Sequence, residues 1–132
     1  MNLNALKLFV LCLFLSCKTT TPLRPTVSVN PQDIIKSPLK LNVNSMGVWY
    51  AREGELGHVQ LLNQDGKEIA LGILTTSENW MKSGPVQFET TLVFDAKKSE
   101  KGTLIIHNNP GDGDGDEAGV NHAFEIPIRF KP

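Results

Sequence analysis

Apolar and polar residues alternate along much of this chain from Ser37 onward. Apolar side chains at every second position are typical of β-strands with one buried face and one solvated face. The alternation predicts three such strands, near residues 39–44, 86–94 and 124–131. The residues predicted to face inward are Leu39, Leu41, Val43, Val86, Phe88, Thr90, Leu92, Phe94, Phe124, Ile126, Ile128 and Phe130.

Three shorter apolar runs, at 59–62, 69–74 and 102–107, predict further strands. The sequence Asn63-Gln64-Asp65-Gly66 predicts a hairpin turn between the first two runs. Pro127 has no N–H to donate to a sheet, which predicts an edge strand or a bulge there. Since no stretch holds a helical apolar period, we expect an all-β fold of about seven antiparallel strands. A two-sheet sandwich is favoured, and a small barrel is the alternative.

The N-terminus has the pattern of an export signal. Lys7 precedes an apolar run at residues 8–15, which fits a secretory h-region and is shorter than a membrane span. The run ends at Ser16-Cys17, which resembles the lipobox of bacterial lipoproteins. We therefore expect residues 1–16 to be a signal peptide and Cys17 to be acylated. The alternatives are an ordinary secretory peptide and an uncleaved anchor.

Cleavage at that site removes Cys12 and leaves Cys17 as the sole cysteine of the mature chain. Acyl chains such as palmitate on Cys17 then anchor the protein to a membrane. Residues 17–36 are rich in Pro, Ser and Thr and predict a flexible tether, which places the folded domain at residues 37–132. The expected location is the cell envelope, with the outer membrane favoured in a Gram-negative cell.

Composition narrows the function classes. The 132 residues allow one domain, and 13 Lys+Arg against 14 Asp+Glu give a net charge of -1 without a basic stripe. Nucleic acid binding, which needs such a stripe, is not expected. The chain has no Gly-x-Ser-x-Gly motif and no cysteine in the predicted domain, so we expect a non-enzymatic protein.

A series of short motifs from about Ser37 to Phe130 resembles the immunoglobulin-like domain of bacterial spore germination. In chain order the motifs are Ser37-Pro38-Leu39, Trp49 with following acidic residues, Val59-Gln60-Leu61-Leu62, Asp65-Gly66, Trp80-Met81, Phe88, Gly102-Thr103-Leu104, Asn109-Pro110 and Ile126-Pro127-Ile128. The resemblance implies an immunoglobulin-like β-sandwich with a binding or structural role in the envelope, and it implies no catalytic residue. The chain departs from the family pattern with a longer segment at 50–58 and an acidic extension at 111–119.

That extension contains the candidate metal ligands Asp112, Asp114, Asp116 and Glu117. Carboxylates at alternate positions are typical of calcium loops, although the Gly and Glu of the helix-flanked calcium motif are absent here. The alternative interpretation is a solvated loop tip. The sequence predicts no cofactor, with calcium at this loop as the alternative.

Trp49, Tyr50 and Trp80 are candidate partner-binding residues, because exposed aromatic rings near turns contact sugars and proteins. The alternative is that the tryptophans close the core. The three histidines show no metal-ligand spacing, and surface or capping roles are expected for them. The leading hypothesis is an envelope lipoprotein whose domain binds or scaffolds an envelope protein or glycan. The alternative is a calcium-responsive envelope protein.

Overall fold

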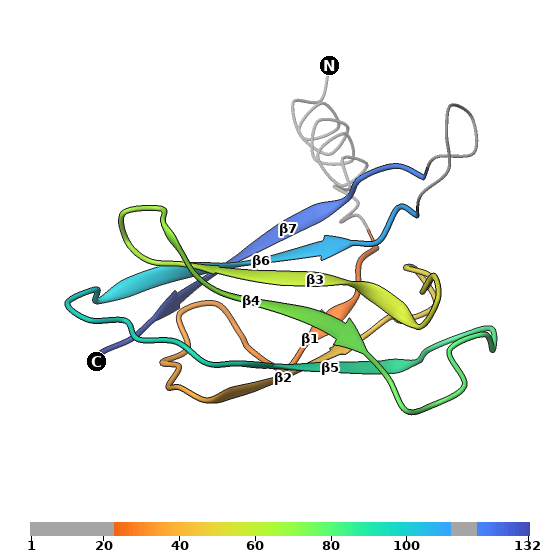
Figure 1. Ribbon diagram of the computed structural model, residues 1–132, viewed down its shortest axis with the longest axis horizontal. Helices are drawn as coiled ribbons and strands as arrows, with labels where there is room; N and C mark the ends of the chain where they lie inside the picture. Colours follow the sequence, from red (N-terminus) through yellow and green to blue (C-terminus); the bar gives the residue numbers. More distant parts are fainter. Residues whose placement is uncertain (1–22, 112–118) are drawn as a thin grey trace, which may run out of the picture.

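A computed structural model describes residues 23–111 and 119–132 (Figure 1). The described residues form strands and connecting loops without a helix, and none of them forms a helical segment that is long and apolar enough to cross a membrane. The strands are β1 (Thr26–Val27), β2 (Leu39–Asn44), β3 (Glu55–Leu62), β4 (Glu68–Thr75), β5 (Gln87–Leu92), β6 (Lys101–Asn108) and β7 (Ala123–Arg129).

The seven strands form one curled sheet in the order β1-β2-β5-β4-β3-β6-β7, and all neighbouring strands are antiparallel. The β4–β5 junction is narrow, since Thr75 and Glu89 are its single paired position. Beyond that pair the two strands diverge (Figure 1). A Cβ at Gly72 of β4 would overlap the Thr90 side chain of β5. Glycine at this position therefore permits the close approach at which the sheet bends.

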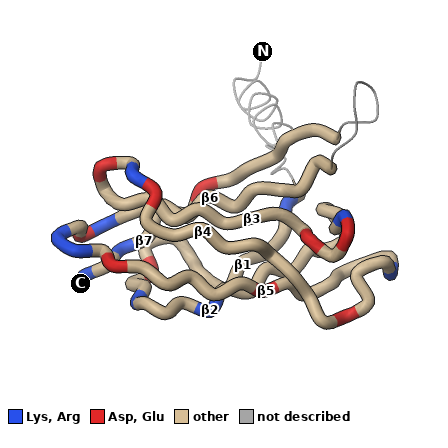
Figure 2. Tube along the Cα trace, viewed as in Figure 1, with Lys and Arg blue, Asp and Glu red and all other residues tan. Residues whose placement is uncertain are grey.

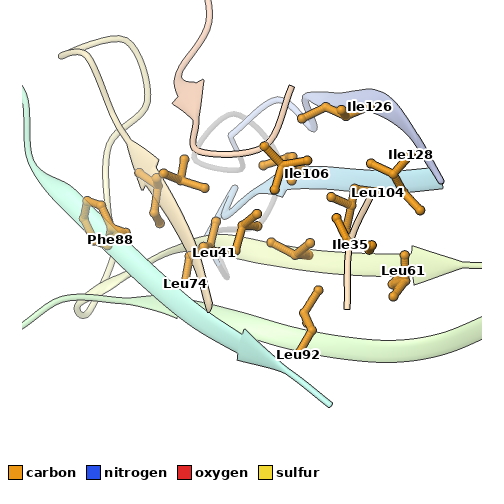
Figure 3. Packing of buried hydrophobic residues seen from close by; sticks show 14 of the residues in the cluster. Ile35, Leu41, Leu61, Leu74, Phe88, Leu92, Leu104, Ile106, Ile126 and Ile128 are labelled. Carbon is orange, nitrogen blue, oxygen red and sulfur yellow. The ribbon is translucent and has the colours of Figure 1, made fainter. Parts of the chain in front are cut away.

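The concave inner face of the curled sheet holds one hydrophobic core, to which every long strand contributes (Figure 3). Its fully buried side chains are Leu41, Val43, Leu56, Val59, Leu61, Leu74, Phe88, Leu92, Leu104, Ile106 and Ile128. Most of them come from alternate positions of their strands, as the period-2 pattern predicts. The exception is the step from Leu56 to Val59 in β3, which follows a register shift between Glu55 and Gly57. Burial of each such side chain stabilises the fold by about 1.5–3 kcal/mol.

The all-β prediction is confirmed for the described residues, and the six predicted apolar segments coincide with six of the seven strands. The turn prediction is also confirmed, because Asn63 N donates to Lys67 O and Gly66 N donates to Asn63 O at the β3–β4 hairpin. Pro127 lies in β7, at one edge of the sheet, as its missing N–H requires. The curled sheet bears out the all-β, antiparallel part of the predicted fold, and the two-sheet sandwich stays a prediction.

The folded part of the chain begins before Ser37. Val29 and Ile35 are buried in the core, and β1 pairs with β2. Ile34 then forms a parallel bridge with Arg129 of β7. This segment thus contacts both edge regions of the sheet, and it includes residues that the sequence analysis assigned to the tether.

Candidate functional site

A cleft of about 270 Å³ opens on the outer face of the sheet, where β3, β6 and β7 meet. It is lined by Glu55, Gly57, His58, Ile73, His107, Asn108, Asn109, Pro110, Asn121, His122 and Ala123. All three histidines of the chain contribute to this lining. The wall is therefore rich in imidazole and amide groups, which donate and accept hydrogen bonds without carrying a fixed charge.

Two of these histidines form a stacked pair. His58 of β3 lies directly opposite His107 of β6 in the sheet register. Their ring centroids are 4.3 Å apart, and the planes differ by only 9°. The neighbouring Gly57 makes this approach possible, because a Cβ there would overlap the backbone carbonyl oxygen of His107. The two imidazole rings thus cover one face of each other, and the stacked pair lines the cleft.

A chain of hydrogen bonds fixes His107. Its Nε2 lies 2.6 Å from Gln60 Oε1, and Gln60 Nε2 donates to Glu68 Oε1 at 3.0 Å. Because an amide oxygen only accepts, His107 Nε2 carries the proton in this arrangement. Burial lowers the pKa of His107, and the adjacent His58 lowers it further. The lowered pKa favours the neutral form of the His107 ring beside the second imidazole.

Two asparagines hold the rim of the cleft. The Asn108 side chain accepts from His122 N at 2.8 Å and donates to Val120 O at 2.9 Å. Asn109 donates from Nδ2 to Glu55 O at 3.2 Å, and its Oδ1 accepts from Gly111 N at 3.0 Å. These amides connect the end of β6 to the starts of β3 and β7. The Asn109-Pro110 motif therefore has a clear structural role here.

The three candidate aromatic residues occupy different environments and do not form one surface. Trp49 is only 8% exposed and contacts Phe124, with the ring centroids 5.7 Å apart. Trp80 is half-buried against the core. Tyr50 is 74% exposed. Trp49 and Trp80 thus lie where the core-closing interpretation places them, and Tyr50 is the ring of the three that is free for contact.

The predicted calcium ligands Asp112, Asp114, Asp116 and Glu117, like Cys17, lie outside the described residues. The described ends of the acidic loop are joined, since Gly119 N donates to Pro110 O at 3.1 Å. The Arg52 side chain packs against Gly111 and Gly119. Within residues 23–111 and 119–132, no three His, Cys, Asp or Glu side chains are grouped to hold a metal ion. Calcium binding by the acidic loop stays a prediction.

Comparison with known proteins gave no match: no protein-family model, no curated protein and no solved structure matches this chain.

Sequence reasoning noted Asn109-Pro110 as a motif but predicted neither this cleft nor the His58–His107 pair. The alternation does place His58 and His107 on the outward face of their strands. Their proximity depends on the β3–β6 register, which joins residues far apart in the chain. A single sequence carries no direct signal for that register.

Proposed function

We propose that this chain is a non-enzymatic envelope lipoprotein, anchored through acylated Cys17, whose folded domain binds an envelope ligand in the cleft beside His58 and His107. The observation that carries the proposal is the cleft itself. It combines the stacked imidazole pair with amide groups, and Glu55 is the only Asp, Glu, Lys or Arg among its described lining residues. Such a wall fits a polar, largely uncharged ligand, and a glycan has this chemistry because its rings stack on aromatic faces while its hydroxyls bond to amides.

The proposal includes an immunoglobulin-like sandwich as the finer description of the fold. The narrow β4–β5 junction divides the strands into a β1-β2-β5 group and a β4-β3-β6-β7 group. This grouping corresponds to the two sheets of immunoglobulin-like domains. It supports the sandwich and is consistent with the resemblance to the spore germination domain, which stays a prediction.

The anchor is tested by metabolic labelling with a fatty-acid analogue in a bacterial host. We expect the wild-type chain and a Cys12→Ala control to incorporate the label and to fractionate with membranes. Cys17→Ala is expected to lose the label, because it removes the thiol that is acylated. Equal labelling of Cys17→Ala and the wild type contradicts the anchor.

The ligand is tested by calorimetric titration of the chain with purified peptidoglycan fragments. We expect His58→Ala to weaken binding by about 10-fold, which corresponds to about 1.4 kcal/mol for one lost stacking contact. Met81→Ala is the matched control, since Met81 is exposed and lies outside the cleft. Absence of binding to the wild type, or equal binding by His58→Ala, contradicts a glycan site here.

A further inference from the structure

The loops of this domain gather at two opposite ends of the sheet. One end, which we call the proximal end, contains the residues at which the described chain begins and the loops that the strand registers bring beside them. Its segments are 23–25, 45–54, 76–86, 109–111 and 119–122. The other end, the distal end, contains the β3–β4 turn and the C-terminus (Figure 1). Its segments are 34–38, 63–67, 93–100 and 130–132.

Contacts between these segments fix the proximal end. The Arg24 guanidinium lies over the Phe124 ring, 4.6 Å from its centroid, and the same ring contacts Trp49 of loop 45–54. Gly54 of that loop lies against the Trp80 indole of loop 76–86. The point at which the chain enters the domain and the two loops therefore form one connected surface.

Exposed apolar side chains are concentrated at the proximal end. Among the described residues, nine large apolar side chains are exposed, and five of them belong to this end. They are Leu23, Met46, Tyr50, Met81 and Val120. Leu23 is 84% exposed, and Tyr50 and Met81 are each 74% exposed. Exposed apolar side chains gathered in one region mark a contact surface.

The two ends also differ in charge. The distal segments carry eight charged residues, Lys36, Asp65, Lys67, Asp95, Lys97, Lys98, Glu100 and Lys131 (Figure 2). The described proximal segments carry five over a longer stretch of chain, Arg24, Arg52, Glu53, Glu78 and Lys82. The distal end thus has the composition of a surface that stays in water, whereas the proximal end is suited to contact with a less polar environment.

The length of the tether selects the end that lies near the membrane. Leu23 follows Cys17, the proposed site of acylation, by six positions. Six extended residues span at most about 20 Å. The eight-residue strand β3 runs between the two ends and spans about 26 Å. The tether therefore keeps the proximal end close to the bilayer, and it is too short to let the distal end face the bilayer instead.

We propose that the proximal end of the domain rests on the lipid surface, with Leu23, Tyr50 and Met81 in contact with the headgroup region. Tyrosine is enriched at membrane–water interfaces because its ring is apolar and its hydroxyl is polar. An arginine such as Arg24 covers apolar surface with its stem and keeps its charge among the headgroups. These contacts add a second attachment to that of the acyl chains.

The inference rests on the anchor of the proposed function and adds an orientation to it. The cleft beside His58 and His107 shares Asn109 and His122 with the proximal end. A domain that rests on this end holds the cleft beside the membrane surface. The acidic sequence 112–117 lies between two proximal segments, so we expect apolar contact, and not attraction to anionic lipid, to hold the domain there.

The test uses the full-length chain, acylated in a bacterial host and reconstituted into vesicles of phosphatidylcholine, which carries no net charge. Signal-peptide cleavage removes Cys12, and acylation blocks the Cys17 thiol, so one introduced cysteine carries an environment-sensitive fluorophore. Tyr50→Cys and Met81→Cys place the fluorophore at the proximal end. Val93→Cys is the matched control, because Val93 is 73% exposed and lies at the distal end.

We expect lipids that carry a quencher to reduce the emission at positions 50 and 81, and we expect this emission to shift to shorter wavelengths. The emission at position 93 is expected to stay unchanged. Circular dichroism checks the fold of each variant, and Leu23→Cys replaces either proximal variant if that variant unfolds.

The outcomes separate this inference from the anchor. If the acylated chain sediments with the vesicles but positions 50 and 81 are quenched no more than position 93, the inference is overturned and the anchor stands. Equal quenching at all three positions also overturns it, since the domain then has no preferred end. A wild-type chain that incorporates no fatty-acid label and does not sediment with vesicles overturns the anchor, and this inference with it.

Discussion

The two faces of β3 and β6 are built from alternating residues of the same strands, yet they differ in what holds them. On the inner face, Leu61, Leu104 and Ile106 are fully buried in a packed core. On the outer face, His58 and His107 stack, and His107 contacts Gln60. The inner face needs only apolar side chains of suitable volume, whereas the outer face depends on specific pairs in one register. The inner face of β3 and β6 therefore stabilises the fold, and their outer face is available for contact.

The largest difference between an inward and an outward residue is expected at the adjacent positions Trp49 and Tyr50. Trp49→Ala removes a buried ring that contacts Phe124 and is expected to lower the free energy of unfolding by about 3–5 kcal/mol. Tyr50→Ala changes an exposed ring and is expected to stay within about 0.5 kcal/mol of the wild type. Urea denaturation of both variants measures the two values. Similar losses at the two positions contradict a purely inward role for Trp49 or a free ring at Tyr50.

A smaller difference is expected within β6. Leu104→Ala opens a cavity in the core and is expected to cost about 2–5 kcal/mol. Ile105→Ala removes a half-buried side chain from the outer face and is expected to cost about 1 kcal/mol. The loss in the free energy of unfolding is measured for both variants by denaturant unfolding at low protein concentration. An Ile105→Ala loss as large as that of Leu104→Ala would indicate that another part of the chain covers the outer face.

This contrast also explains how far the sequence predicted the structure. The core could be predicted because alternation is local: Leu41 and Val43, or Ile126 and Ile128, are inward whatever strands lie beside them. The order of the strands could not, because the β3–β6 and β2–β5 pairs join segments that are distant in the chain.

The N-terminal boundary was difficult for a different reason. Val29 and Ile35 lie among prolines and polar residues, a composition typical of linkers. They are buried because the segment bridges two distant strands, β2 and β7, and those contacts are tertiary. The cleft contains one feature of each kind. The Asn109-Pro110 motif is local and was visible in the sequence, whereas the His58–His107 stack depends on strand pairing and was not.

The smallest effect that distinguishes the two faces is the pH dependence of stability contributed by His107. Burial, followed by the influence of His58, lowers the pKa of His107 below that of a histidine in the unfolded chain. In the window between the folded pKa and the ordinary value of about 6.5, the unfolded state binds more protons than the folded state. Stability therefore decreases as the pH falls through this window and is constant above it. Protonation also sets a charge against the stacked His58 ring and acts on the outer face alone.

His107→Gln is expected to remove this part of the pH dependence, because glutamine stays neutral and its amide can still donate to Gln60. The measurement is the melting temperature from about pH 8 to about pH 5, across the range in which histidine titrates. His122→Gln is the matched control, since His122 lines the same cleft but lies outside the stacked pair. If His107→Gln loses stability on acidification as steeply as the wild type and the control do, the stacked pair is not the acid-sensitive element of the outer face.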